Sequence, residues 1–300
     1  MTLFIKKILS FFLLIAFTVL SVSFLFNSYI NKKTQFSLSK NVTNIIFGHS
    51  HPEVAFNDSL ISNFQNLAQS GESYFYTFLK AKQVFKNNPQ IENVFIEFSN
   101  IDVTRVRDKE IWSDKYINWR YPNYAAWMRL SEQTLLFTKN PKSVVKVIPK
   151  TLKKQWERII EKQFNYVSTT SGYLYVNESK LDSLIQSNYH LQNPDPDYFK
   201  KSNENLYYLN KLIDLCLEYD KNVYFVRSPI FKNSFYMWNE SLFQEIRNKQ
   251  FPNIPFLDYV NYQVPNSYFR DLHHLNFMGA ADFSRQFNEW LQNKKPKNNP

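Results

Sequence analysis

The chain has 300 residues, enough for one good-sized domain with an appendage. Hydrophobic residues make up 44% of it and charged residues 21%, an ordinary globular balance that excludes wholesale disorder. The net charge is +10, but the Lys and Arg are scattered and accompany no recognisable nucleic-acid motif. We therefore expect no nucleic-acid partner. A single cysteine, Cys216, excludes an intrachain disulfide and a cysteine-based metal site.

The N-terminal segment predicts a membrane anchor. Residues 8–26 carry no charge, follow Lys6 and Lys7, and are long enough to span a bilayer. We expect residues 1–27 to form a single membrane-spanning anchor and 28–41 a polar tether. The short N-terminal tail places the following domain outside the cytoplasm, on the periplasmic side. Cleavage as a signal peptide after the small-residue stretch 21–23 is the alternative.

Beyond the tether, short apolar runs alternate with helical patterns. The alternation predicts an α/β domain over residues 42–292, with a parallel sheet of about five strands. In such sheets the site lies outside the carboxyl ends of the strands. Residues 102–200 break the rhythm and are expected to form a helical insertion, and 293–300 a polar tail. Strands are expected at 44–47, 64–68, 94–98, 223–226 and 256–257, and helices at 73–86, 206–216, 240–248 and 276–292. The helix at 206–216 should bury Cys216, and Asn276 should cap the last helix.

The stretch "FGHSHPE", residues 47–53, has two chemical interpretations. In the first, His49, His51 and Glu53 are metal ligands. The stretch resembles the Gly-His-Thr-His block of calcineurin-like metallophosphoesterases. In that family the block closes the domain, whereas here it opens it, and the other ligand blocks of that family do not occur. Further ligands would have to come from Asp271, His273 and His274, so we predict no metal at this site.

In the second interpretation Ser50 is a nucleophile. Gly48-x-Ser50 directly follows an apolar run, and a tight turn there would present the hydroxyl. Near the other end of the chain, "RDLHHLNFMGA" places Asp271 three residues before His274. A carboxylate that accepts from one imidazole nitrogen leaves the other free to take a serine proton. The sequence therefore predicts a Ser50, His274 and Asp271 triad.

These motifs resemble the SGNH/GDSL-type hydrolases, which have a flavodoxin-like, three-layer α/β fold with four short sequence blocks. Gly48-His49-Ser50 resembles the first block, and residues 66–71 resemble the second, which ends here at Gly71. Phe98-Ser99-Asn100 stands where the third block is expected, and Asp271-x-x-His274 resembles the last. Two positions depart from the family pattern: His49 replaces an aspartate, and the third block lacks its glycine. The resemblance covers residues 42–100 and 203–292.

The resemblance implies a serine-dependent hydrolase of carboxylic esters that needs no cofactor. Its catalytic residues would be Ser50, Asp271 and His274, and its oxyanion donors the amides of Ser50 and Gly71 with the side chain of Asn100. Four further residues are candidates for the substrate rim: His49, His51, Glu53 and His273. The anchor suggests an O-acylated cell-surface glycan as substrate. Two alternatives stay open: an O-acyltransferase that uses the same site, and a noncatalytic glycan-binding or assembly protein on a degenerate SGNH fold.

Overall fold

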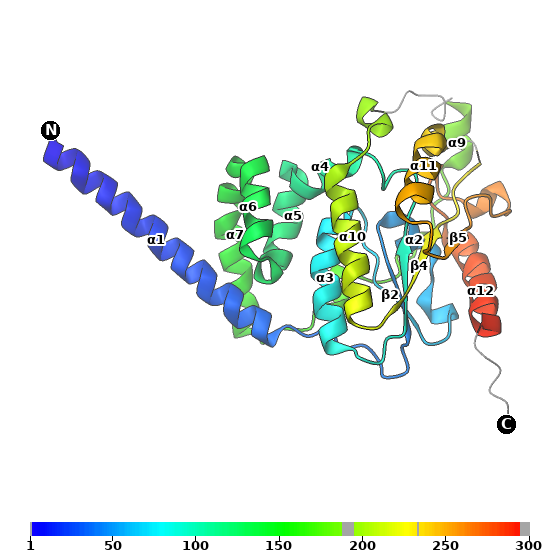
Figure 1. The fold of residues 1–300 in the computed structure, drawn as a ribbon, viewed down its shortest axis with the longest axis horizontal. Coiled ribbons are helices and arrows are strands. Elements are labelled where there is room, and N and C mark those ends of the chain that lie inside the picture. The colour runs from blue at the N-terminus through cyan, green and yellow to red at the C-terminus, as the bar shows by residue number, and fades with distance from the viewer. Residues whose placement is uncertain (1, 188–194, 233, 295–300) are drawn as a thin grey trace. The chain divides into compact units, whose positions relative to one another are not determined.

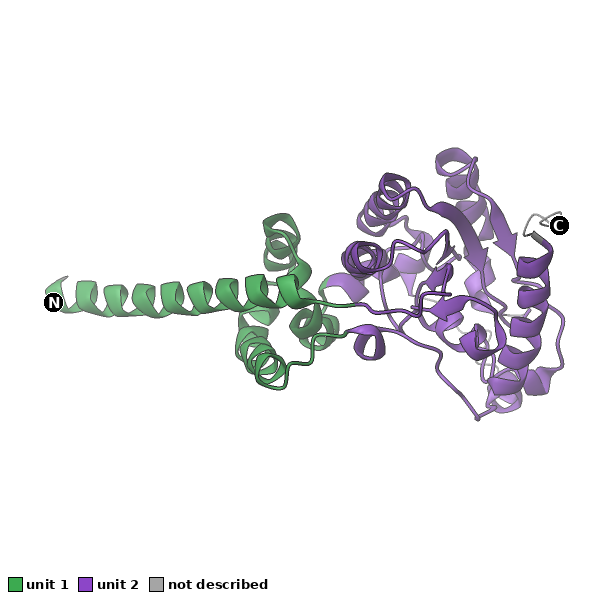
Figure 2. Cartoon of the chain, turned by 90° about the horizontal axis from the view of Figure 1, so that it is seen from below, with its two compact units in different colours: residues 1–35, 112–165 green, residues 36–111, 166–300 purple. Residues whose placement is uncertain are grey.

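The computed structural model describes residues 2–187, 195–232 and 234–294. The chain divides into two compact units (Figure 2). Unit 1 comprises residues 1–35 and 112–165, and unit 2 comprises residues 36–111 and 166–300. Each unit is described separately.

Unit 2 contains a five-stranded, all-parallel sheet with the strand order β2-β1-β3-β4-β5. The strands are β1 (Asn44–Phe47), β2 (Phe64–Asn66), β3 (Asn93–Glu97), β4 (Asn222–Arg227) and β5 (Phe256–Asp258). All five lie where the apolar runs predict them. The α/β class and the parallel sheet of about five strands are therefore confirmed.

The direction in which strands are added to the sheet reverses beside β1. The chain passes from β1 to β2 on one side and then returns to place β3 on the other side. Loops that leave two neighbouring strands in opposite directions open a crevice at their carboxyl ends, where ligands bind in open α/β sheets. Here these are the loops after Phe47 of β1 and after Glu97 of β3.

Neighbouring residues of β1 pack against different helices. The ring of Phe47 contacts Phe85 of α3, with ring centroids 6.2 Å apart. Ile46 instead joins an apolar cluster that contains Phe283 and Phe287 of α12. This follows from the strand geometry, because successive side chains point to opposite faces of a sheet. The α-helices of unit 2 are α2 (Ser50–Ala55), α3 (Tyr74–Asn87), α4 (Val106–Trp112), α8 (Val167–Thr170), α9 (Leu181–Gln186), α10 (Asn203–Glu218), α11 (Glu240–Gln250) and α12 (Phe277–Lys294).

The single cysteine lies in the core, as predicted. Cys216 is on α10, which packs beside α3 (Figure 1), and its side chain is fully buried. Burial raises the pKa of its thiol well above the ordinary value. A thiol of this kind is inert in the folded state and reacts when unit 2 unfolds.

The last helix begins at the predicted cap. The side-chain oxygen of Asn276 accepts hydrogen bonds from the amides of Met278 and Gly279, at 3.0 and 3.2 Å. These bonds satisfy two of the free donors at the start of α12 and fix the direction in which residues 269–275 enter it. The predicted polar tail lies outside the described residues from 295 onward.

Unit 1 is entirely helical where it is regular. It contains α1 (Thr2–Lys33), α5 (Asp114–Tyr124), η2 (Ala125–Trp127), α6 (Leu130–Lys139) and α7 (Pro141–Ile160). The last third of α1 packs on the other helices, where Asn27 accepts from Gln155 at 2.6 Å. Just after α1, Thr34 accepts from the indole of Trp127 at 3.1 Å. Residues 3–18 of α1 are exposed along their whole length. The helix is long and apolar enough to cross a membrane.

Two predicted boundaries differ from the structure. The tether expected from residue 28 continues α1 as far as Lys33, because Ile30 is fully buried inside unit 1 and holds this polar stretch in the helix. The helical insertion was expected at 102–200. Only residues 112–165 of that range belong to unit 1, and the remaining residues belong to unit 2 with the sheet. No sequence pattern indicated that this segment packs against the N-terminal helix.

Candidate active site

The site begins at a sharp turn between β1 and α2. Gly48 has φ +157°, and a Cβ atom there would lie 2.6 Å from the Cβ of Glu97 and 2.7 Å from the Cγ of Pro52. Only glycine fits such a close approach. The turn makes Ser50 the first residue of α2, and His49 caps the helix by accepting from the His51 amide at 3.4 Å.

Ser50 is joined to a residue 224 positions later in the chain. Its hydroxyl oxygen lies 2.8 Å from Nε2 of His274. Nδ1 of the same imidazole lies 2.9 and 3.0 Å from the two carboxylate oxygens of Asp271. Nδ1–H therefore donates to Asp271, which leaves Nε2 to accept the Ser50 proton. The structure thus brings the three predicted catalytic residues together in the order that the chemistry requires.

Asp271 is held as a carboxylate. Burial by itself would raise its pKa, but the hydrogen bond from His274 and the backbone amide of His273 outweigh burial and lower the pKa to about 2. One carboxylate oxygen also accepts from the amides of His273 and His274, at 2.8 and 3.0 Å. This set of donors orients the carboxylate toward the imidazole and keeps it ionised at neutral pH.

His273 faces a different group of residues. Its ring stacks on that of Tyr236, with centroids 3.8 Å apart and an 11° angle between planes, and its Nδ1 lies 2.9 Å from the hydroxyl of Ser234. Burial, together with the neighbouring His274, lowers the pKa of His273 to about 3. His273 is therefore a neutral ring beside the triad, and its Nδ1 contacts Ser234, whereas Nε2 of His274 contacts Ser50.

The predicted second block lies beside the Ser50 turn. The amide of Gln69 donates to the carbonyl of Gly48 at 3.0 Å, which ties the loop after β2 to the start of α2. Gly71 follows in this loop with φ +60°. Glu53, predicted at the rim, accepts from both the amide and the hydroxyl of Ser70, so it anchors the same loop.

A buried ion pair holds this loop in place. Lys80 and Glu72 are both fully buried, with Nζ of Lys80 2.7 Å from a Glu72 oxygen. Nζ also donates to the carbonyl of Leu67 at 2.6 Å and to that of Thr170 at 3.0 Å. A buried ammonium that contacts both Glu72 carboxylate oxygens and these two carbonyls fixes the segments it joins. Sequence reasoning did not identify this pair.

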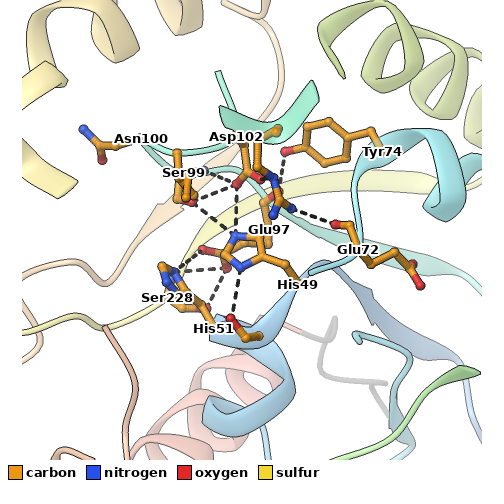
Figure 3. A network of polar contacts seen from close by, with 12 residues as sticks. His49, His51, Glu72, Tyr74, Glu97, Ser99, Asn100, Asp102 and Ser228 are labelled. Atoms are coloured by element: carbon orange, nitrogen blue, oxygen red, sulfur yellow. Dashed lines mark hydrogen bonds and ion pairs between the residues drawn. The ribbon is translucent and has the colours of Figure 1, made fainter. Parts of the chain in front are cut away.

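Asn100 has partners other than the triad. Its amide nitrogen donates to Glu240 at 2.7 Å, and its oxygen accepts from Arg227 at 2.9 Å. Arg227 in turn forms ion pairs with Glu240 and Asp258. In Figure 3 Asn100 points away from the histidines that flank Ser50. The structure therefore does not bring the Asn100 side chain to Ser50, and its neighbour Ser99 contacts His49 instead, at 3.5 Å.

The two histidines that flank Ser50 belong to a buried polar network (Figure 3). Nε2 of His49 lies 3.3 Å from Asp102, and Nδ1 of His51 lies 3.8 Å from Glu97. Burial lowers the pKa of both histidines. His49 and His51, which sequence analysis placed at the substrate rim, are instead buried, being only 3% and 4% exposed.

Two acidic members of this network were missed from the sequence. Glu97 ends the otherwise apolar strand β3, and Asp102 follows in the next loop. A carboxylate at the carboxyl end of a buried strand is the signal that could have identified Glu97. Burial, reinforced by Asp102, raises the pKa of Glu97 to about 8, although Ser228 donates to its carboxylate.

Comparisons with known proteins add little to this geometry. The model of an uncharacterised protein family matches residues 177–295, a segment that includes Asp271 and His274 but not Ser50. No curated protein matches the chain.

Proposed function

We propose that the chain is a serine-dependent hydrolase of carboxylic O-acyl esters, built on the flavodoxin-like, three-layer fold of the SGNH/GDSL-type enzymes. The observation that carries the proposal is the hydrogen-bonded chain from Ser50 through His274 to Asp271. A hydroxyl, an imidazole and a carboxylate joined in this order form the arrangement that activates a serine for acyl transfer.

In the proposed reaction the Ser50 hydroxyl oxygen attacks the acyl carbonyl. Nε2 of His274 takes the serine proton and returns it to the alkoxide of the leaving alcohol. Asp271 fixes the imidazole tautomer and stabilises the imidazolium that forms. Water then attacks the acyl-enzyme, again with proton transfer through His274, and releases the carboxylic acid and free Ser50.

The negative oxygen of the tetrahedral intermediate needs hydrogen-bond donors. We assign this role to the backbone amides of Ser50 and Gly71, because the Gln69–Gly48 hydrogen bond holds the two loops together. Each well-placed donor contributes about 3 kcal/mol to lowering the barrier. Asn100 is left out of this set because Glu240 takes its amide nitrogen.

We also propose that α1 anchors the enzyme in a membrane, with unit 2 outside the cytoplasm. The support is the length and apolar character of α1 and the exposure of its first half. Lys32 and Lys33 end the helix, as expected for residues that emerge among lipid headgroups. An enzyme held there meets acylated cell-surface glycans, which are the substrates that we propose.

Ser50→Ala should abolish ester hydrolysis. The change removes one oxygen from a half-buried position and leaves His274 and Asp271 in place, so the fold should survive. We expect turnover of a chromogenic acyl ester to fall by about 10⁴-fold or more. Asn100→Ala serves as a second variant and should stay within about tenfold of the wild type. Turnover that is unchanged in Ser50→Ala would rule out the proposed nucleophile.

The adjacent histidines should differ sharply. His274→Ala removes the base that contacts Ser50, and we expect a loss of turnover similar to that of Ser50→Ala. His273→Ala removes only the ring stacked on Tyr236 and should retain at least about a tenth of the activity. The measurement is kcat/KM for the same ester. An inactive His273→Ala together with an active His274→Ala would reverse the assignment of the base.

The anchor should remain on the mature protein. We expect the full chain to stay in the membrane fraction after alkaline carbonate extraction, and its N-terminal peptide to begin at residue 1 or 2. Mass spectrometry of the purified protein measures this directly. A mature N-terminus near residue 24 would show instead that the segment is a cleaved signal.

A further inference from the structure

A group of potential metal ligands lies at the turn that presents the proposed nucleophile. His49, His51 and Glu97 each offer one ligand atom, and these atoms all lie within 4.8 Å of one another. All three side chains are buried, and they meet in the middle of the network in Figure 3. We propose that they bind one divalent transition-metal ion, with Zn²⁺ the best match. This set differs from the one considered from the sequence, because Glu97 replaces Glu53 and the late histidines take no part.

Both imidazoles have a lone pair available. Nε2 of His49 lies 3.3 Å from Asp102, so it carries the proton and leaves Nδ1 as the acceptor. That Nδ1 accepts from the His51 amide at 3.4 Å, a contact that is long for a hydrogen bond. Nδ1 of His51 is buried and has no hydrogen-bond partner among the described residues. A buried nitrogen without a partner is costly, and a metal ion would satisfy it.

Neighbouring residues already orient two of the three ligand side chains, His49 and Glu97. Asp102 accepts from the distal nitrogen of His49, the carboxylate–histidine arrangement that commonly supports metal ligands. Nε of Arg107 fixes the other Asp102 oxygen from 3.2 Å. Ser228 donates to the Glu97 carboxylate from its hydroxyl at 2.6 Å and its amide at 3.2 Å. The three ligands therefore come from the start of α2 with the turn before it and from the end of β3, and their supports come from the segments that follow β3 and β4.

The composition of the site favours zinc. Two neutral imidazoles and one carboxylate are borderline and hard ligands of the kind that Zn²⁺ accepts, and three protein ligands leave a fourth position for water. The ion would also supply positive charge to Glu97, whose carboxylate is fully buried and lies 3.8 Å from the neutral ring of His51. Since His49 and His51 flank Ser50, a bound ion would clamp the turn that presents the nucleophile to the end of β3.

The test measures metal content and is separate from hydrolysis. Full-length protein in detergent is stripped with EDTA, dialysed against 10 μM Zn²⁺, desalted and analysed by mass spectrometry of the metal. We expect about one zinc per chain, and a rise in the unfolding temperature of about 5 °C or more over the stripped protein. His51→Gln and Glu97→Gln should each lose the zinc. His273→Gln, a neighbouring buried histidine outside the set, should keep it.

Each outcome decides the proposal. A wild-type chain that takes up no zinc, or variants His51→Gln and Glu97→Gln that bind as much as the wild type, would overturn it. Loss of zinc in His273→Gln would also overturn this choice of ligands.

Alkylation of Cys216 reports whether each variant is folded. If both glutamine variants unfold, the visible d–d bands of the Co²⁺-loaded wild type decide, since His-ligated tetrahedral cobalt absorbs and free cobalt barely does. Ester hydrolysis by the stripped protein separates this proposal from that of the Ser50 nucleophile.

Discussion

The hydrogen bond between Ser50 and His274 is the contact on which the proposed chemistry of unit 2 depends, and it joins the first strand-to-helix turn to the last. The bond is 2.8 Å long and spans 224 residues of sequence. Two separate constraints aim its ends. Gly48 lets β1 turn within van der Waals distance of Glu97 and Pro52, and Asn276 starts α12 just after the His274 loop. Neither constraint is part of the proposed chemistry, yet each sets where one reacting atom lies.

The packing of α12 explains how the far end stays in place. Phe283 and Phe287 of this helix contact Phe56, with ring centroids 5.0 and 4.9 Å away, and Phe56 directly follows α2. The helix that follows His274 (α12) and the helix that begins with Ser50 (α2) are thus locked together by aromatic burial. Fully burying one such side chain contributes about 2 kcal/mol. The hydrogen bond itself contributes less than the packing that positions it.

Much of this architecture could be predicted from the sequence, and the failures have physical causes. The strands were recognisable because they are short apolar runs with turn residues behind them, as at residues 44–48. Ser50, Asp271 and His274 were recognisable because their spacing restricts which atoms can meet. Asn100 was assigned by its place after β3, but a side chain's partner depends on what other segments bring near it, and Arg227 and Glu240 come from far along the chain. The helix from residue 28 to Lys33 was missed for the same reason, since burial of Ile30 overrides a polar, linker-like sequence.

The buried charges behind the site show how tightly the triad is supported. Glu72 with Lys80, and Asp102 with Arg107, lie under the loops that carry Gly71 and Ser99. Burial of so many ions is costly unless each is paired, so their presence marks loops that are held rigid. The most direct test of the proposed chemistry is reaction of the folded, full-length protein with a fluorophosphonate, followed by peptide mapping. A single adduct on Ser50, absent from heat-unfolded protein and from Asp271→Asn, is the predicted result. An adduct on another serine, or equal labelling of Ser50 in folded and unfolded protein, would contradict the account.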